Sequence, residues 1–292
     1  AVYLRLLGHE ISNGGFVLDV NETPDPEEFE DAYMRYANAR VCPPRPAEKT
    51  YRVRGTQEPF YTLNVIDGIM SVSAVQKVAK QYQASITEYL NAVLLYSLLQ
   101  KQEHDFHLRL RPVRIAMPVN LRRFFPSKTL RNFITMVYPS IDPRLGDYTF
   151  EEIVTQVHHY MRYYINSKFL RGDITTNAST QRNPLIRIVP LFLKDFVVRQ
   201  FYQRVQDKNS SAGLTNMGAI RVPDDMKPYL ERFDIYMGIP YSQRTNCAIV
   251  SFEDTLTVNF ASCIIEADVE RRFFQKLVED GIPVTIESNR EL

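Results

Sequence analysis

Polar and basic residues gather in the stretch PVNLRRFFPSKTLRNF, from Pro118 to Phe133. The preceding run VRIAMPV predicts a strand that ends near Pro118, because β-branched residues favour strands and proline interrupts their hydrogen bonding. Asn120, Arg122 and Arg123 therefore follow a strand end, where substrate clefts commonly open. A guanidinium there can form a bidentate pair with a carboxylate or a phosphate. A solvated turn anchored by its phenylalanines explains the same spacing equally well.

The histidines and acidic pairs are weaker candidates for catalysis. His158 and His159 are adjacent in a predicted helix, so their side chains point about 100° apart and cannot bind one metal ion together. A structural or surface role is expected for both. The other histidines lie in settings that indicate solvation: His9, His104 and His107. Acidic pairs at 151–152 and 224–225 begin predicted helices, where attraction to the helix dipole explains them.

The sequence lacks the common signatures of a nucleophile, a phosphate loop or a metal site. It contains no GxSxG, GxGxxG or GxxxxGK[ST] motif. Its 3 cysteines are widely spaced and form no CxxC or Cys/His pattern, which argues against zinc and against a disulfide framework. We therefore expect no metal and a reducing, cytoplasmic compartment.

Composition predicts a globular protein without strong attraction to polyanions. The chain has 292 residues, 45% of them hydrophobic, and 35 Lys+Arg against 34 Asp+Glu give a net charge of +1. Such a balance does not favour nucleic-acid binding. No apolar run reaches the roughly 20 residues that span a bilayer, so no membrane span is predicted.

Helices alternate with strands along the chain, which finishes in an antiparallel run. Strands are predicted at 61–71, 113–119, 133–141, 211–218, 233–239, 246–254, 255–265 and 283–288. Helices are predicted at 24–40, 72–83, 85–102, 149–169, 184–206, 224–233 and 268–281. This order indicates an α/β or α+β layered domain built on a mixed sheet.

Several residues are expected to shape these elements. Thr149 stands three residues before Glu152, as in a capping box, and Thr87 is expected to cap its own helix. Gly68 is expected at a bend. Pro190 should kink the apolar helix around it, where the stretch 185–198 suits a core helix, a lobe interface or an apolar substrate.

The first fifty residues are expected to be separate from the rest. AVYLRLL reads as the end of a helix that Gly8 terminates, which indicates a piece of a longer protein, although removal of an initiator methionine leaves the same start. The prolines of VCPPRPAEK cannot continue a helix. We therefore predict a linker that divides residues 1–50, a remnant of an N-terminal lobe, from residues 51–292.

Three segments of the chain, by their order and spacing, resemble the C-terminal half of the chloramphenicol-acetyltransferase-like superfamily. They are PVNLRRFFP with LRNF, then LTNMG, then FDIYMGIP. This superfamily includes alcohol acetyltransferases, plant acyltransferases with a DFGWG motif, and condensation domains of nonribosomal peptide synthetases. The YLRL at residues 3–6 is most similar to bacterial alcohol-acetyltransferase-like proteins. The resemblance covers nearly the whole chain. It implies a two-layer sandwich in which helices pack on a mixed sheet, and it makes 51–292 an acyltransferase-like C-terminal lobe. Of DFGWG, the chain keeps Asp234 and Gly238.

The catalytic signature of this superfamily, HHxxxDG, is absent from the sequence. Its second histidine is the general base, and His158 and His159 are followed by no such aspartate and glycine. The resemblance therefore implies that the base lies before Ala1 and that this chain supplies no catalytic residue. In relatives, the motif's aspartate pairs with the arginine that Arg122 matches, and Asn120 matches a position facing the reaction centre. A buried arginine without its carboxylate partner lowers the stability of a protein by about 3–5 kcal/mol. Arg122 is therefore expected to find solvent or another partner.

The resemblance also predicts how substrates bind. It places Thr215 and Asn216 at the coenzyme A or pantetheine arm, while Arg123 and Arg131 are expected at coenzyme A phosphates or, equally, in solvent. The implied protein is a coenzyme A-dependent acyltransferase that moves an acyl group from a thioester to a small alcohol or amine, with the missing N-terminal lobe as its partner. Two alternatives remain. One is a non-catalytic module that binds a carrier protein or a lipid, and the other is a condensation-like domain acting on carrier-bound substrates.

Overall fold

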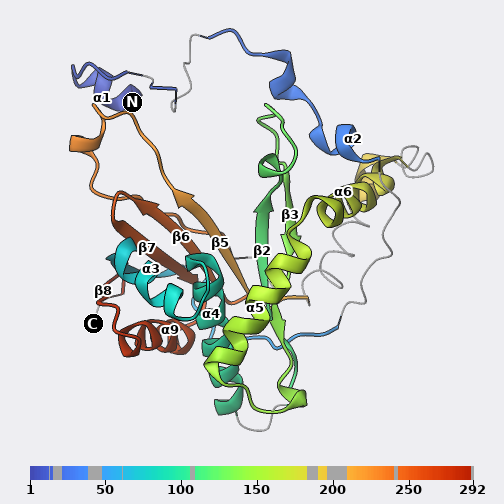
Figure 1. The fold of residues 1–292 in the computed structure, drawn as a ribbon, viewed down its shortest axis with the longest axis vertical. Helices are drawn as coiled ribbons and strands as arrows, with labels where there is room; N and C mark the ends of the chain where they lie inside the picture. Colours follow the sequence, from blue (N-terminus) through green and yellow to red (C-terminus); the bar gives the residue numbers. More distant parts are fainter. Residues whose placement is uncertain are drawn as a thin grey trace.

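The computed structural model describes residues 1–12, 14–15, 22–38, 48–60, 62–105, 109–182, 190–195, 209–239 and 243–290 (Figure 1). Within them lies an eight-stranded mixed sheet in the order β3-β2-β5-β6-β7-β1-β8, and β4 also pairs with β2, near the start of that strand. Helices pack on this sheet, so the predicted α/β class with a mixed sheet is confirmed. His107 and one of the three widely spaced cysteines, Cys42, lie outside the described residues.

The strands are β1 (Asn64–Ser71), β2 (Val113–Asn120), β3 (Ile134–Val137), β4 (Ser140–Ile141), β5 (Ala212–Ala219), β6 (Thr245–Phe252), β7 (Thr255–Ser262) and β8 (Thr285–Ser288). The α-helices are α1 (Val2–Leu6), α2 (Ala32–Tyr36), α3 (Val72–Gln81), α4 (Ile86–His104), α5 (Phe150–Tyr164), α6 (Ser167–Arg182) and α9 (Asp268–Glu279), and residues 191–195 are also helical.

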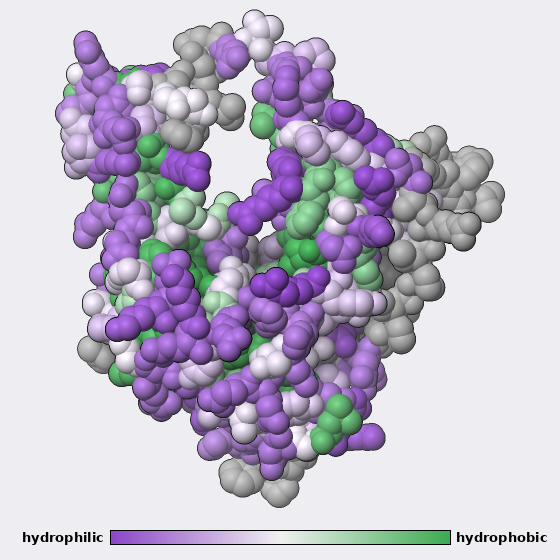
Figure 2. All heavy atoms as spheres, viewed as in Figure 1, coloured by the Kyte–Doolittle hydropathy of each residue, from purple (hydrophilic) through white to green (hydrophobic). Residues whose placement is uncertain are grey.

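The sheet separates into two arms between β2 and β5. These strands run parallel and are registered only at Ile115 with Ala212 and at Ala116 with Gly213. Beyond that point β2 continues against β3, and β5 continues against β6. Figure 1 shows the two arms leaning apart above helices α3, α4 and α9. The space-filling view shows the surface hollowed between these two arms (Figure 2).

The core lies between the sheet and helices α3, α4, α5 and α9 (Figure 1). Helix α4 is its centre, since Tyr89, Leu90 and Leu94 are completely buried. Gly68 lies within β1 rather than at the predicted bend, and a Cβ added there would lie 2.0 Å from Phe274 Cε1. Close approach of α9 to the sheet explains this glycine.

The opposite face of the sheet is covered by residues 231–239. Ile235 N donates to Asn259 Oδ1 at 3.2 Å, and Asn246 Nδ2 donates to the Gly238 carbonyl at 3.1 Å. The strand predicted at 233–239 is therefore wrong. This segment joins no strand of the described sheet, because side chains of β6 and β7 bind its backbone groups in place of a ladder.

The helix caps differ in part from the predictions. The capping box of Thr149 and Glu152 at α5 is confirmed. At α4 the predicted cap at Thr87 is wrong, because Ser85 Oγ accepts from Glu88 N at 3.2 Å and Glu88 Oε2 accepts from Ser85 N at 2.7 Å. Gly8 follows α1 with a φ of +87°, as expected for a glycine that ends a helix.

Three predicted helices are interrupted. Within 24–40, a 3-10 turn at Pro26–Phe29 precedes α2 because Asp25 and Asp31 each cap a separate turn. The helix predicted at 149–169 breaks before Asn166, whose Oδ1 accepts from Phe169 N at 3.0 Å and starts α6. The helix predicted at 224–233 is reduced to a 3-10 turn, Lys227–Tyr229. The predicted kinked helix at 184–206 lies largely outside the described residues.

The N-terminal residues contact both arms. Ser12 N donates to Asp225 Oδ2 at 2.7 Å on the β5 side, and Lys128 Nζ binds Asp25 Oδ2 at 2.8 Å on the β2 side. Tyr51 is buried, and its backbone N donates to the Pro112 carbonyl. The proposed division of the chain at residue 50 stays a prediction. None of the described helices is both long and apolar enough to cross a lipid bilayer.

Candidate functional site

Asn120 ends β2 and starts a short 3-10 turn, Leu121–Arg123. Its Oδ1 accepts from Arg122 N at 3.1 Å, which turns the chain away from the sheet. Asparagine favours such positions because its side chain can accept from the backbone two residues on. Leu121 is completely buried beneath the turn, whereas Asn120 is exposed. The residue types at Asn120 and Leu121 therefore determine the turn that follows β2.

Arg122 binds the loop that follows it. Its Nη2 donates to the carbonyls of Thr129 and Arg131 at 2.7 Å each, and its Nε donates to the Thr129 carbonyl at 3.3 Å. No carboxylate among the described residues forms an ion pair with it. The expectation of a substitute partner is met by two backbone carbonyls, which close the hairpin between β2 and β3.

Residues 25–36 hold this hairpin from outside. Thr129 is buried, and its Oγ1 donates to the Glu30 carbonyl at 2.6 Å. Tyr33 uses its hydroxyl both to donate to the Ile134 carbonyl and to accept from Ile134 N. Burial of this hydroxyl raises the pKa of Tyr33. The carbonyls that bind Arg122 are therefore part of a fixed loop.

Arg123 and Arg131 are exposed, and their guanidinium groups form no hydrogen bond within the described part of the chain. Arg123 points across the opening, because a Cβ added at Gly218 of β5 would lie 4.0 Å from Arg123 Nη2. Both groups are free to meet an anion. Their expected contact with coenzyme A phosphates stays a prediction.

Thr215 and Asn216 lie on β5 beside the opening, but successive strand residues point to opposite faces. Asn216 points to the helices, where its Nδ2 donates to Thr87 Oγ1 at 2.8 Å, while its Oδ1 accepts from Gly218 N at 2.8 Å. Thr215 points to the face covered by residues 231–239. The structure brings both residues to the opening and separates them by the thickness of the sheet.

A polar cluster at the start of α4 was not predicted as a site. Asn91 is completely buried, and its Nδ2 donates to the Thr87 carbonyl at 2.8 Å and to Met117 Sδ at 3.4 Å. Glu88 Oε1 lies 3.4 Å from His158 Nδ1 of α5. The signal was present in the sequence, since an asparagine interrupts the otherwise apolar run YLNAVLL.

Figure 2 shows a hollow between the two arms, with hydrophilic side chains at its rim and hydrophobic ones deeper. Arg123 and Asn120 belong to the rim by their positions at the end of β2. The described residues contain no group of three or more His, Cys, Asp or Glu that could hold a metal ion. The arrangement can bind an anion at the rim and a mostly apolar chain below it.

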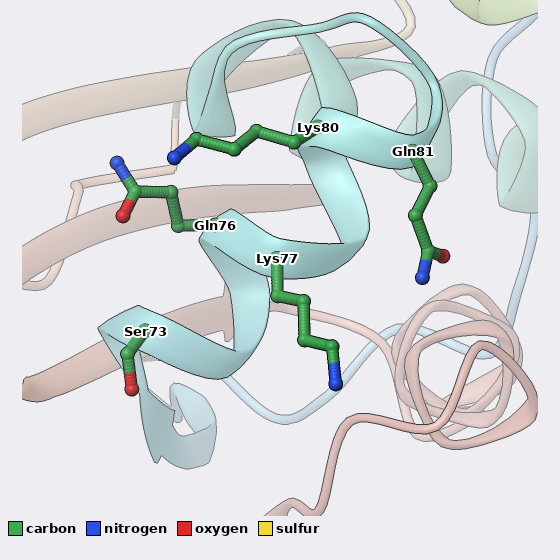
Figure 3. Close-up of a pocket in the computed structure, with 5 residues that line it drawn as sticks. All are labelled: Ser73, Gln76, Lys77, Lys80 and Gln81. Carbon is green, nitrogen blue, oxygen red and sulfur yellow. The ribbon is translucent and has the colours of Figure 1, made fainter.

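A second, shallow pocket lies on α3, lined by Ser73, Gln76, Lys77, Lys80 and Gln81 (Figure 3). All of its lining residues belong to this one helix. Figure 3 shows the ammonium groups of Lys77 and Lys80 pointing in different directions. Without a second element to close it, this pocket is a weaker candidate than the opening between the arms.

No protein-family model and no curated protein sequence matches the chain. Solved structures are similar to it. The trichothecene 15-O-acetyltransferase of Fusarium sporotrichioides matches with a TM-score of 0.51 at 14% identity, over 90% of this chain and 53% of that protein. The nonribosomal peptide synthetase FmoA3 matches with a TM-score of 0.51 at 10% identity, over 80% of this chain and 23% of that one.

A wax ester synthase/diacylglycerol acyltransferase of Marinobacter aquaeolei VT8 gives a lower TM-score of 0.44 at 12% identity, over 86% of this chain and 56% of that protein. This chain spans about half the length of the acetyltransferase that it matches. Such low identities show the fold alone. The chain has the fold of chloramphenicol-acetyltransferase-like acyltransferases and condensation domains, as its sequence motifs predicted.

Proposed function

We propose that this chain is the C-terminal lobe of a cytoplasmic, coenzyme A-dependent acyltransferase of the alcohol-acetyltransferase type. The observation that carries the proposal is the similarity of 90% of the chain to about half, 53%, of an acetyltransferase. The PVNLRR and LTNMG motifs lie at the facing ends of the two arms, at β2 and β5. Both motifs therefore border the opening between the arms, which supports the proposal.

In the proposed reaction, a histidine base on the preceding N-terminal lobe takes the proton of an alcohol or amine. The freed electron pair attacks the thioester carbonyl, the carbon–sulfur bond breaks, and the thiolate of coenzyme A takes up the proton. No covalent acyl-enzyme forms. Alignment of the two substrates in one passage supplies much of the rate enhancement.

The residues of this chain act by binding and positioning. Arg122 holds the hairpin at the reaction end through Nε and Nη2. Its Nη1, which forms no hydrogen bond within the described residues, pairs with the aspartate of the base loop. Arg123 and Arg131 meet the phosphates of coenzyme A at the rim. Thr215 contacts the pantetheine arm from one face of β5, and Asn216 fixes that strand to α4.

A second candidate is a condensation-like domain whose substrates are bound to carrier proteins. The similarity to a nonribosomal peptide synthetase at a TM-score of 0.51 favours it. A carrier-bound substrate has no nucleotide phosphates to bind. Loss of Arg123 and Arg131 would then leave activity unchanged.

The test compares the 292-residue chain with the same chain preceded by the polypeptide encoded upstream. Acetyl-coenzyme A cleavage in the presence of a primary alcohol is followed by release of the free thiol. We expect turnover only with the longer protein, and loss of turnover when its second motif histidine is replaced by alanine. Robust turnover by the shorter chain would refute the division between a catalytic lobe and a binding lobe.

A further inference from the structure

Asn91 combines complete burial with an unpaired acceptor. Its Oδ1 has no hydrogen-bond donor. Among the described residues, the only other buried side-chain nitrogen or oxygen without a hydrogen bond is His158 Nδ1, and that atom lies 3.4 Å from Glu88 Oε1. Exchanging the amide oxygen and nitrogen would not help, because the oxygen would then face the Thr87 carbonyl. Buried acceptors are normally satisfied, so an exception calls for an explanation.

The position of Asn91 coincides with the point where the arms separate. Its neighbour Met117 is the first residue of β2 beyond the last registered pair with β5, Ala116 with Gly213. On α4, residues 87, 91 and 88 follow one another within about 100° around the helix. Thr87 contacts β5, Glu88 faces α5, and Asn91 lies between them against β2.

The other asparagine at this point, Asn216, already uses both ends of its amide. Asn216 uses its amide nitrogen for Thr87 and its oxygen for Gly218. Of these two asparagines, Asn91 therefore has the side-chain oxygen that can still accept a hydrogen bond from a ligand. Leu214 and Met117 line the same face of the sheet and are apolar, which excludes a charged group as occupant. The flexible thioether of Met117 can move to admit a chain.

We propose that Asn91 Oδ1 accepts a hydrogen bond from a neutral N–H or O–H group of the substrate that enters between β2 and β5. This inference rests on the proposed acyltransferase function and adds a binding residue on α4 to it. Both substrates carry such an N–H or O–H group. The acyl thioester has the amide N–H groups of its pantetheine arm, and the substrate alcohol has its hydroxyl.

The experiment observes the Asn91 side-chain amide directly by NMR in the chain labelled with ¹⁵N-asparagine. Its signal is identified as the one missing from the Asn91→Leu variant, or from Asn91→Ser if the leucine variant does not fold. Coenzyme A and butan-1-ol are titrated separately at millimolar concentration, so that weak binding to one lobe is detected. Ser97→Ala is the matched control, because Ser97 is a buried polar residue of α4 whose hydroxyl, among the residues that the structure describes, bonds only to the Val93 carbonyl.

We expect one probe to shift the Asn91 signal, and Asn91→Leu to bind that probe about tenfold more weakly, while Ser97→Ala binds it normally. A shift with coenzyme A means that Asn91 Oδ1 binds the pantetheine arm, and a shift with butan-1-ol means that it binds the substrate alcohol. Binding that shifts other asparagines but not Asn91 overturns this inference and leaves the proposed function intact, with a buried water as the partner of Oδ1. Failure of both probes to bind overturns both proposals.

Discussion

Asn216 of β5 donates a hydrogen bond of 2.8 Å from Nδ2 to Thr87 Oγ1 of α4. The oxygen of the same amide accepts from Gly218 N, across a bulge in the strand. Gly218 has a φ of +75°, a conformation that glycine adopts without strain. One side chain thus fixes both the shape of β5 and its distance from α4 beside the opening between the two arms.

Replacement of Asn216 by alanine should lower the free energy of unfolding by about 1–3 kcal/mol, because Gly218 N and Thr87 lose a partner together. Thr215→Ala is the control, since Thr215 lies on the other face of the same strand. It should change stability by less than about 0.5 kcal/mol and weaken coenzyme A binding instead. Urea denaturation measures both variants, and equal losses from the two would contradict the structural role of Asn216.

Arg122→Ala should loosen the hairpin between β2 and β3. It removes the charged donors that bind the carbonyls of Thr129 and Arg131, each at 2.7 Å, and we expect a loss of about 2–3 kcal/mol in the free energy of unfolding. Arg122→Lys should recover only part of this, because lysine lacks the planar fork of donors. Hydrogen exchange of residues 129–134 should accelerate in both variants.

Arg131→Ala supplies the comparison for that loop. The Arg131 side chain is exposed and forms no hydrogen bond within the described residues, while its backbone carbonyl is unchanged by the substitution. We expect a change within about 0.5 kcal/mol. If Arg131→Ala accelerated exchange as much as Arg122→Ala, the guanidinium of Arg122 would not be what holds the loop.

Local signals predicted most of the secondary structure. Helix α5 has a periodic apolar face and a complete capping box, and half of the residues in β6 and in β7 are β-branched or aromatic, so each element is determined by its own residues. Residues 233–239 have the same strand-like composition. They are not a strand because Asn246 and Asn259, distant in sequence, occupy their backbone groups.

The candidate site was predictable to the same extent. The turn at Asn120 and Arg122 follows from local residue types. The opening between β2 and β5 was not predicted. The carbonyl partners of Arg122 depend on how the loop folds back, which spacing does not reveal. The role of Asn91 depends on where β2 leaves β5, a long-range property of the sheet.

Gly68→Ala should destabilise the protein because of a single contact. The added Cβ would lie 2.0 Å from Phe274 Cε1, and overpacking of this kind costs about 1–3 kcal/mol. In a Phe274→Leu background, the same substitution should cost less, because the smaller side chain leaves room. Thermal unfolding of the original chain, the two single variants and the double variant gives the coupling energy between positions 68 and 274. If the two effects were strictly additive, the loss of stability with alanine would come from the backbone at position 68 and not from contact with Phe274.

Glu270 is a buried acid in α9, and it should make stability depend on pH. Burial raises the pKa of Glu270, and the hydrogen bond from Thr245 Oγ1, 2.6 Å long, opposes this only in part. In the folded protein the Glu270 carboxyl therefore keeps its proton at pH values above its pKa in the unfolded chain, which is about 4.3. The contribution of Glu270 to the free energy of unfolding is fully present below that pH. It falls by up to about 1.4 kcal/mol per pH unit until the pH has passed the pKa of Glu270 in the folded protein.

Glu270→Gln should remove this loss, since glutamine stays neutral and can still accept from Thr245. The variant and the original chain are compared by urea denaturation from pH 4 upwards, and the difference in unfolding free energy is taken at each pH so that the other titrating groups cancel. The difference should grow in favour of glutamine as the pH rises and then become constant. A difference that does not change with pH would mean that Glu270 ionises in the folded state as it does in the unfolded chain.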